Sequence, residues 1–105
     1  MTQETQAQLR GLVVHPEDNV VNLVGPGEAG RTVHCVVEGR DEAEQIELRD
    51  DIPSNHKLAR RDIAVGEAIV KYGLSIGKAS AAIDRGEHVH VHNIESNRGR
   101  GDLQG

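Results

Sequence analysis

Short stretches of β-branched and aliphatic residues, separated by turn residues, follow one another along most of the chain. No segment carries apolar residues at i, i+3, i+4 and i+7 over three turns, so the pattern does not predict a long helix. Alternating polar and apolar positions predict strands instead. The expected strands span residues 12–15, 32–38, 45–49, 58–61, 68–72 and 87–94. Residues 19–24 fit a strand or a short helix, residues 79–83 fit a helical turn or a strand edge, and the charged run 40–44 fits a solvated loop.

The chain repeats itself with an offset of 20 residues. Residues 59–69 align without a gap to residues 79–89, and both copies follow the pattern A-x-x-x-I-x-x-G-E-x-[IV]. Each copy is typical of an apolar anchor, a turn at Gly66 or Gly86, and a strand, and the glutamate after each glycine is expected to stabilise the turn or stay solvated. Two copies are too few for a solenoid, but they suit a pseudo-two-fold pair of hairpin-like elements. The pattern therefore predicts a small, mostly β fold with short helical turns.

Three of the six histidines lie at alternating positions, His88, His90 and His92, with Val89 and Val91 between them. If they lie on one strand, the imidazoles share one face and the valines share the core-facing side. Imidazole ligates metals and titrates near neutral pH, so this face suits metal binding or proton transfer. Same-face neighbours on a flat strand are about 7 Å apart, which is too far to share one ion easily. We expect no complete metal site within the chain, with His90 and His92 as the candidate ligands, and a polar face without a ligand is the alternative.

The composition limits both the core and the partners. A length of 105 residues predicts one domain over residues 11–95, flanked by flexible segments at 1–10 and 96–105. The chain has no Trp or Phe, so its core must be aliphatic, with the single tyrosine, Tyr72, expected to cap it. A thin core favours a surface that a partner covers. The net charge of −5 argues against non-specific nucleic-acid binding, and no apolar run is long enough to span a membrane.

The chain contains one cysteine, Cys35, in an apolar strand context. A buried, unreactive thiol is favoured over a nucleophile there. A single cysteine cannot form an internal disulfide, and the first residues lack the basic and apolar regions of a signal peptide. We therefore expect a cytoplasmic protein.

Three motifs stand out in the second half of the chain: H-K-L-A at 56–59, K-Y-G-L-S-I-G at 71–77 and G-E-H-V-H-V-H-N at 86–93. Together they resemble the small N-terminal module of the altronate and galactarate dehydratase family. The similarity covers residues 52–95, with a looser similarity back to residue 12. That family dehydrates sugar acids and includes two-subunit sulfolactate sulfo-lyases, in which the small module is a separate chain. The resemblance implies a SAF-like β-clip fold, with which the 20-residue repeat agrees.

The resemblance also implies a function. It implies the small subunit of a two-component hydro-lyase that dehydrates a sugar acid, such as altronate or galactarate, to a 2-keto-3-deoxy acid. The implied partner is a large catalytic subunit, which would hold most of the ligands of a divalent metal, Fe²⁺ by resemblance. That ion would polarise the carboxylate and the α-hydroxyl of the substrate. The small subunit alone is expected to be inactive.

The resemblance assigns candidate roles to six residues at the rim of the shared site. The catalytic candidates are His56, His90 and His92. The candidates for binding the anionic hydroxy acid are Lys57, Lys71 and Asn93, because a lysine supplies a mobile positive charge. His88 is the weakest of the histidine candidates, because the family does not fix a histidine there.

Other interpretations remain open at this stage. The chain could be the small subunit of a sulfolactate sulfo-lyase, which breaks a carbon–sulfur bond. It could also be a non-catalytic β-clip that binds a sugar acid or a protein, with the histidine face as the ligand platform. His56 and Lys57 could form a solvated polar pair that opens a strand. In isolation the chain could assemble as a homo-oligomer.

Overall fold

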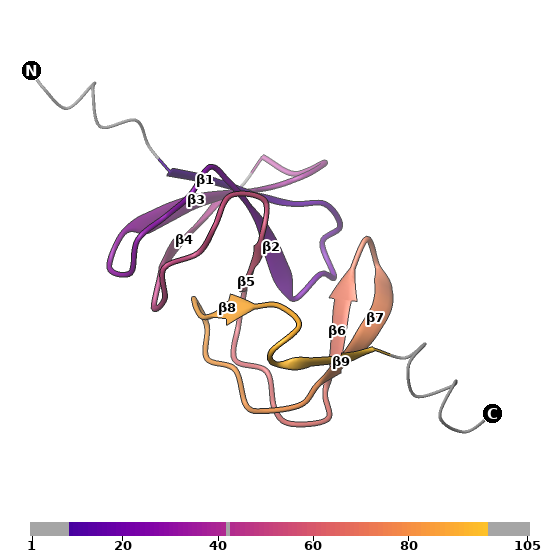
Figure 1. Cartoon of the computed structure of the whole chain (residues 1–105). Coiled ribbons are helices and arrows are strands. Elements are labelled where there is room, and N and C mark those ends of the chain that lie inside the picture. Colours follow the sequence, from indigo (N-terminus) through magenta and orange to yellow (C-terminus); the bar gives the residue numbers. More distant parts are fainter. Residues whose placement is uncertain (1–8, 42, 97–105) are drawn as a thin grey trace, which may run out of the picture.

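The computed structural model describes residues 9–41 and 43–96, and all regular structure in these ranges consists of strands (Figure 1). The prediction of a mostly β fold is confirmed. The expected short helical turns are not found, because the described residues contain no helix. The strands are β1 (Leu9–Val13), β2 (Val20–Val24), β3 (Thr32–Val37), β4 (Ala43–Glu47), β5 (Lys57–Ala59), β6 (Ala68–Lys71), β7 (Leu74–Ala79), β8 (His88–Val89) and β9 (Ile94–Ser96).

The strands form two sheets. Six strands pair in the order β4-β3-β1-β2-β5-β8, and three pair in the order β6-β7-β9. Neighbours are antiparallel except for β1 and β3, which are parallel. Figure 1 shows β1, β3 and β4 in one half of the molecule and β6 to β9 in the other, with β2 and β5 running between the halves. The six-stranded sheet therefore extends from the first half of the molecule into the second, where β8 is its last strand.

Two aliphatic clusters form the core. Alternation along β1 and β3 buries every second residue, which supplies the inner face of the first cluster. The second cluster belongs mainly to the repeat region and consists of Val20, Ala59, Ile63, Ile69, Ala79, Ile83 and Val89. Full burial of one such Val or Ile side chain stabilises the fold by about 1.5–3 kcal/mol. The absence of large aromatic residues is thus offset by close packing of small side chains.

The two repeat copies pair with each other. Ile63 and Ile83, which are equivalent positions, exchange two backbone hydrogen bonds of 2.8 and 2.9 Å. The strand pairing also repeats with the 20-residue offset. Leu58 pairs with His88, and the equivalent residues of the other copy, Lys78 and Ala68, pair with each other. The predicted pseudo-two-fold arrangement of the copies is confirmed.

The turn glycine of each copy forms a backbone hydrogen bond with the other copy. Gly66 donates its N–H to the carbonyl of Ala79 at 2.8 Å, and Gly86 donates to the carbonyl of Ala59 at 2.9 Å. Each turn therefore bonds to the alanine that opens the other copy. Both glycines have positive φ, at 85° and 93°, which is the reason for glycine in the repeated motif.

The repeated glutamates stabilise these turns, as predicted. Oε1 of Glu67 accepts the backbone N–H of Ala64 at 2.9 Å, and Oε1 of Glu87 accepts that of Asp84 at 2.7 Å. The two equivalent contacts close the two turns in the same way.

Several expected boundaries are corrected by the structure. The first strand begins at Leu9 rather than residue 12, so the N-terminal boundary of the ordered part precedes residue 11. Ala43 and Glu44 belong to β4 and not to a loop, and residues 74–79 form β7. Residues 19–24 contain β2 and not a helix, and residues 79–83 form the end of β7 and an isolated bridge. The remainder of the two segments that were predicted to be flexible, at 1–8 and 97–105, lies outside the described residues.

Candidate functional site

The expected strand over residues 87–94 is wrong. Strand β8 ends at Val89, and residues 91–93 form a turn before β9. Asn93 causes the turn: its Oδ1 accepts the N–H of His90 at 3.0 Å, and its Nδ2 donates to the carbonyl of His88 at 2.8 Å. A side-chain amide that bonds neighbouring backbone groups competes with strand pairing. Val91, expected to face the core, is 80% exposed on this turn.

The turn gathers histidines more tightly than a strand would. The ring of His88 lies 5.5 Å from that of His90 and 5.1 Å from that of His92, measured between centroids. Flat-strand geometry predicted separations of about 7 Å between same-face neighbours. The expectation that these imidazoles share one side of the chain therefore holds, although a turn rather than a strand places them there.

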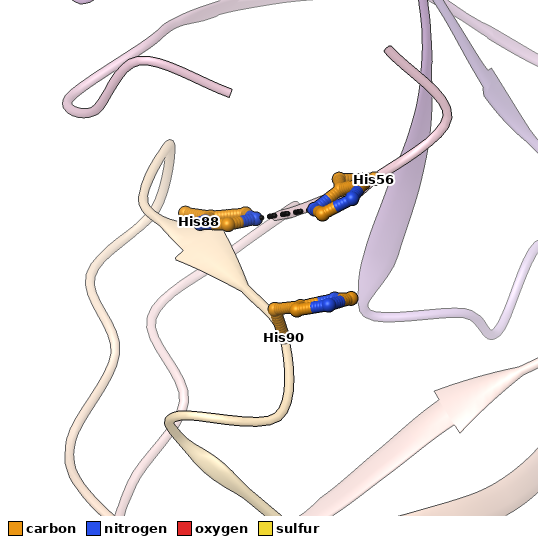
Figure 2. Close-up of side chains that lie close together, drawn as sticks. All are labelled: His56, His88 and His90. Atoms are coloured by element: carbon orange, nitrogen blue, oxygen red, sulfur yellow. Dashed lines mark hydrogen bonds between the residues drawn. The ribbon is translucent and has the colours of Figure 1, made fainter. Parts of the chain in front are cut away.

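His56 joins this group from a distant part of the chain. Its Nδ1 lies 2.9 Å from Nε2 of His88 in a hydrogen bond, and its ring stacks on His90 with centroids 4.1 Å apart. Figure 2 shows the His56 and His88 rings meeting edge to edge, with the His90 ring beside them. Three ring nitrogens, one each from His56, His88 and His90, lie within 4.8 Å of one another. We call these three residues the histidine trio.

The backbone around His56 is fixed by strand β2. The N–H of Leu23 donates to the carbonyl of His56, and the N–H of Asn55 donates to the carbonyl of Leu23, both at 2.9 Å. Asn55 has a φ of 69°, a value that asparagine tolerates better than most residues. Strand β5 begins directly afterwards and pairs Leu58 with His88. This register is what brings His56 beside β8.

Burial and mutual repulsion favour the neutral forms of His88 and His90. Burial lowers the pKa of His88, the positive charges of the other three histidines lower it further, and Asp50 opposes them. Burial also lowers the pKa of His90, with further lowering by His56 and Lys57. A neutral imidazole has a free ring nitrogen, so it can accept a proton or ligate a metal.

Lys57 adds positive charge next to the histidines, since its charge lowers the pKa of His90. The pKa of Lys57 is itself lowered, first by burial and then by the charge of Lys71. Lys71 also lies 5.0 Å from the centroid of the Tyr72 ring. Lys57 and Lys71 are both half-buried, whereas Tyr72 is 58% exposed. The expectation that Tyr72 caps the core is therefore wrong.

Asp18 and Asn19 hold the hairpin that carries Lys71. The buried Asp18 carboxylate accepts the N–H groups of Tyr72 at 3.0 Å and Gly73 at 2.8 Å. These two residues form a two-residue turn with φ values of 59° and 73°, the signature of a type I′ hairpin turn. The side chain of Asn19 bonds the carbonyl of Ala68 and the N–H of Val70, both at 2.8 Å.

The sequence-predicted site residues thus fall into two groups. His56, His90 and Lys57 are brought together, with the exposed His92 at the margin, whereas Lys71 is connected to this group only through the effect of its charge on Lys57. Asn93 is 8% exposed and bonds within its own turn, so it positions the histidines, and its role in substrate binding stays a prediction. His92 does not belong to the trio, although it was a candidate metal ligand.

Sequence reasoning undervalued three residues. His88 completes the trio, but its position follows from the long-range pairing with Leu58. Asp50 accepts the backbone N–H of His88 at 2.9 Å, and Asp18 fixes the hairpin of Lys71. The only local signal was the third imidazole in the alternating pattern. Nothing near Asp18 or Asp50 in the sequence indicates these contacts.

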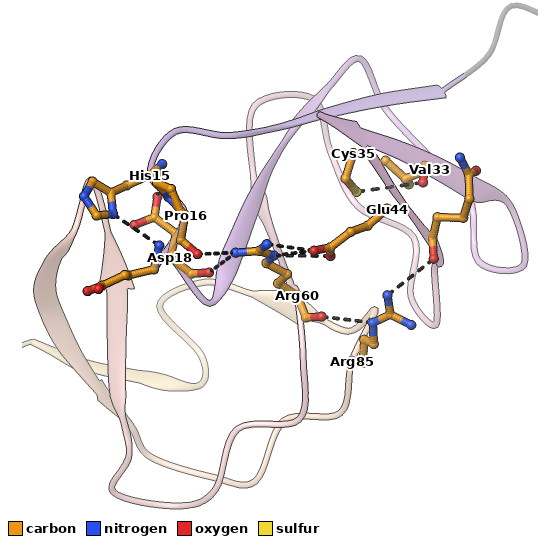
Figure 3. A network of polar contacts seen from close by, with 10 residues as sticks. His15, Pro16, Asp18, Val33, Cys35, Glu44, Arg60 and Arg85 are labelled. Atoms are coloured by element: carbon orange, nitrogen blue, oxygen red, sulfur yellow. Dashed lines mark hydrogen bonds and ion pairs between the residues drawn. The ribbon is translucent and has the colours of Figure 1, made fainter. Parts of the chain in front are cut away.

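A polar network lies apart from the cluster and is structural (Figure 3). Arg60 bonds the carboxylate of Glu44, at 2.7 Å for the shortest contact, and the carbonyls of Pro16 and Asp18. Cys35 is fully buried, as predicted, and burial raises the pKa of its thiol to about 12, which favours the unreactive form. The three hollows described in the surface are lined by other residues, none of them a histidine. His56, His88 and His90 are half-buried, and His92 is exposed.

Comparisons with known proteins place the chain in a family. Residues 9–97 match the altronate/galactarate dehydratase SAF domain. The chain is 43% identical over 88 residues to (2R)-sulfolactate sulfo-lyase subunit alpha of Chromohalobacter salexigens, across 82% of this chain and 94% of that one. It is 39% identical to altronate dehydratase of Bacillus subtilis and 38% identical to that of Escherichia coli, each across 80% of this chain.

The two kinds of relative differ in length. The chain spans nearly the whole sulfo-lyase subunit alpha but only 16% of each altronate dehydratase. Within the described residues no helix is long and apolar enough to cross a membrane. The matched region contains both repeat copies and every residue of the histidine cluster. The chain belongs to the altronate/galactarate dehydratase SAF-domain family.

Proposed function

We propose that this chain is the small component of a two-component lyase and contributes a histidine and lysine face to an active site that it shares with a larger catalytic subunit. The observation that carries the proposal is the convergence of four histidines, with Lys57 beside them. The three hollows described in the surface do not include these groups, and a second chain would complete a pocket around them. A relative of nearly equal length is named as a subunit of a lyase, which supports the proposal.

The proposed reaction is an elimination from a 2-hydroxy acid. The α-proton leaves, the group on the β-carbon departs as water or sulfite, and the resulting enol becomes a 2-keto acid. Lys57 binds an anionic group of the substrate, since its charge acts on His90, and Lys71, whose charge acts on Lys57, is the candidate for a second anionic group. His92, the most exposed of the four imidazoles, takes or returns a proton. A divalent metal held mainly by the large subunit, Fe²⁺ by resemblance, would polarise the carboxylate and the α-hydroxyl.

Two substrate classes are candidates. The near-complete match to a sulfolactate sulfo-lyase subunit favours a 2-hydroxy acid with a β-sulfonate, which two lysines suit because it carries two anionic groups. The match to altronate dehydratases favours a sugar acid that loses water. Both reactions use the same α-proton removal, so the same residues of this chain serve either one.

The test is an anaerobic assay of this chain mixed with the large subunit and Fe²⁺. It measures 2-keto acid formation from altronate, galactarate and sulfolactate, and sulfite release from sulfolactate. Activity should require both chains and should fall about 100-fold or more in a His92→Ala variant, as is usual for loss of an acid–base group. His34→Ala, a histidine outside the cluster, is the matched control. Full activity from the large subunit alone would contradict the proposal and favour a non-catalytic binding module.

A further inference from the structure

We propose that the histidine trio of His56, His88 and His90 is a metal site within this chain itself, which takes a divalent ion of the imidazole-preferring class such as Zn²⁺. This site differs from the metal expected in the large subunit, because all three ligands come from one chain. The proposal departs from the expectation that no complete site exists within the chain. The inference does not rest on the proposed function, since metal binding by the isolated chain requires neither partner nor substrate.

The ligand atoms already lie close to a binding geometry. All three ring nitrogens are within 4.8 Å of one another, and Nδ1 of His56 and Nε2 of His88 are 2.9 Å apart. Zn²⁺ holds imidazole nitrogens at about 2.0–2.1 Å, so two ligands of a tetrahedral ion lie about 3.4 Å apart. The longest separation must therefore shorten by roughly 1.4 Å, and the closest pair must part slightly. All three side chains are partly exposed, so their rings have room to rotate.

Two ring nitrogens of the trio, Nδ1 of His56 and Nε2 of His88, already face each other across a hydrogen bond. In the hydrogen bond between His56 and His88, one nitrogen carries the proton and the other accepts it. A metal ion would occupy the place of that proton and bind both nitrogens. Figure 2 shows the His90 ring on the same side of the chain as this contact, where it can supply the third ligand.

The backbone holds each ligand in place before any metal binds. His88 pairs with Leu58, and its N–H donates to Asp50 at 2.9 Å. The N–H of His90 donates to Asn93 at 3.0 Å. With His56 fixed against β2, closing the site requires only side-chain rotation. Little ordering entropy then opposes metal binding.

The ligand type selects the ion. Three neutral imidazoles without a carboxylate or thiolate suit Zn²⁺, Ni²⁺, Co²⁺ or Cu²⁺, and do not suit Mg²⁺ or Ca²⁺, which need oxygen ligands. Three protein ligands leave a fourth position open, as in catalytic zinc sites. Lys57, whose charge acts on His90, disfavours a bare cation and favours an anion at that fourth position. Asp50 partly balances the charge from the other side.

The test is calorimetric titration of the full chain with Zn²⁺, and with Mg²⁺ as a comparison. We expect one Zn²⁺ per chain and no measurable Mg²⁺ binding. His88→Ala should weaken Zn²⁺ binding at least tenfold. His92→Ala is the matched control, because it removes an adjacent histidine outside the trio and should leave the affinity within twofold. An absence of Zn²⁺ binding, or an equal loss in both variants, would overturn the proposal.

A second measurement uses the unaltered chain and so avoids the risk that a variant misfolds. Zn²⁺ should shift the imidazole ¹⁵N resonances of His56, His88 and His90, with smaller shifts for His34 and His15. Equal shifts across all histidines would show adventitious binding and would overturn the site.

Discussion

The guanidinium of Arg60 joins parts of the chain that are far apart in sequence. It forms an ion pair with Glu44 from β4 and donates to two carbonyls in the connection between β1 and β2 (Figure 3). The sequence pattern treated Glu44 as part of a solvated loop, because nothing local distinguishes a paired carboxylate from a free one. By contrast, the burial of Cys35 could be predicted from the residues around it, since β3 alternates regularly and its inner positions are apolar.

The Arg60 contact predicts a specific dependence of stability on pH. The hydrogen bond from Arg60 lowers the pKa of Glu44 below its ordinary value of 4.5. A carboxyl whose pKa is lower in the folded state stabilises the fold above its unfolded pKa and loses this contribution as the pH falls through the folded pKa. Glu44→Gln should therefore lower the free energy of unfolding at pH 7 and leave it nearly unchanged at pH 2. Urea unfolding of both proteins at the two pH values measures this difference.

The matched control is Glu38→Gln, an exposed carboxylate outside the network. Its effect should be the same at both pH values. A loss in Glu44→Gln that is equally large at pH 2 would contradict the ion-pair explanation and indicate a packing effect.

At the scale of elements, the sequence predicted the regularly alternating strands and the repeat, but it did not predict the turn at residues 90–93. Strands β3 and β6 fall where their alternation or β-branched content indicates, whereas the pattern over β2 left a short helix open. Residues 87–94, which extend beyond the second copy of the repeat, also looked like a strand, because histidine and valine alternate there. The amide of Asn93 decides otherwise by satisfying two backbone groups locally. His88 was undervalued for a similar reason, since its partner His56 is 32 positions away.

The equivalent glycines of the two copies should differ in their tolerance of a side chain. A Cβ at Gly86 would overlap the carbonyl oxygen of Glu47, whereas a Cβ at Gly66 has no atom within 4 Å. Both have positive φ, which costs an L-residue about 1–2 kcal/mol. Gly66→Ala should lower the free energy of unfolding by about that amount, and Gly86→Ala by at least about 1 kcal/mol more. Thermal or urea unfolding compares the two variants, and equal losses would contradict the steric argument.

At the scale of the whole molecule, the hairpin of β6 and β7 presents an uncovered apolar surface. Leu74 is 68% exposed and Ile76 is 36% exposed, two positions apart on β7. The hairpin also carries Lys71, whose charge acts on Lys57, so a subunit that covers Leu74 would approach the proposed site. The composition pointed to a partner-covered surface, because a core without large aromatic residues is thin. It could not locate that surface, since the location depends on how the sheets pack.

Leu74→Glu should weaken association with the large subunit without unfolding the chain. Burial of a leucine side chain contributes about 1.5–3 kcal/mol, so its loss should raise the Kd by roughly 10- to 100-fold. Val24→Glu, at a 53% exposed position on β2, is the control and should leave the Kd within a few-fold. Surface plasmon resonance with the immobilised large subunit measures both. Equal affinity of Leu74→Glu and the unaltered chain would exclude this hairpin from the interface.

The reciprocal bonds between the two repeat copies bear on how such a domain can arise and diversify. Each copy supplies the backbone partners that the other lacks, so one copy alone must find a second molecule to pair with. Joining two copies in one chain replaces that concentration-dependent encounter with an intramolecular one. The joined copies need no longer be identical at their tips. After the first copy, the chain forms the tight Tyr72–Gly73 turn, and at the equivalent place after the second copy it forms the histidine-bearing turn. Duplication therefore allows one copy to preserve the scaffold while the turn after the other copy gains functional side chains.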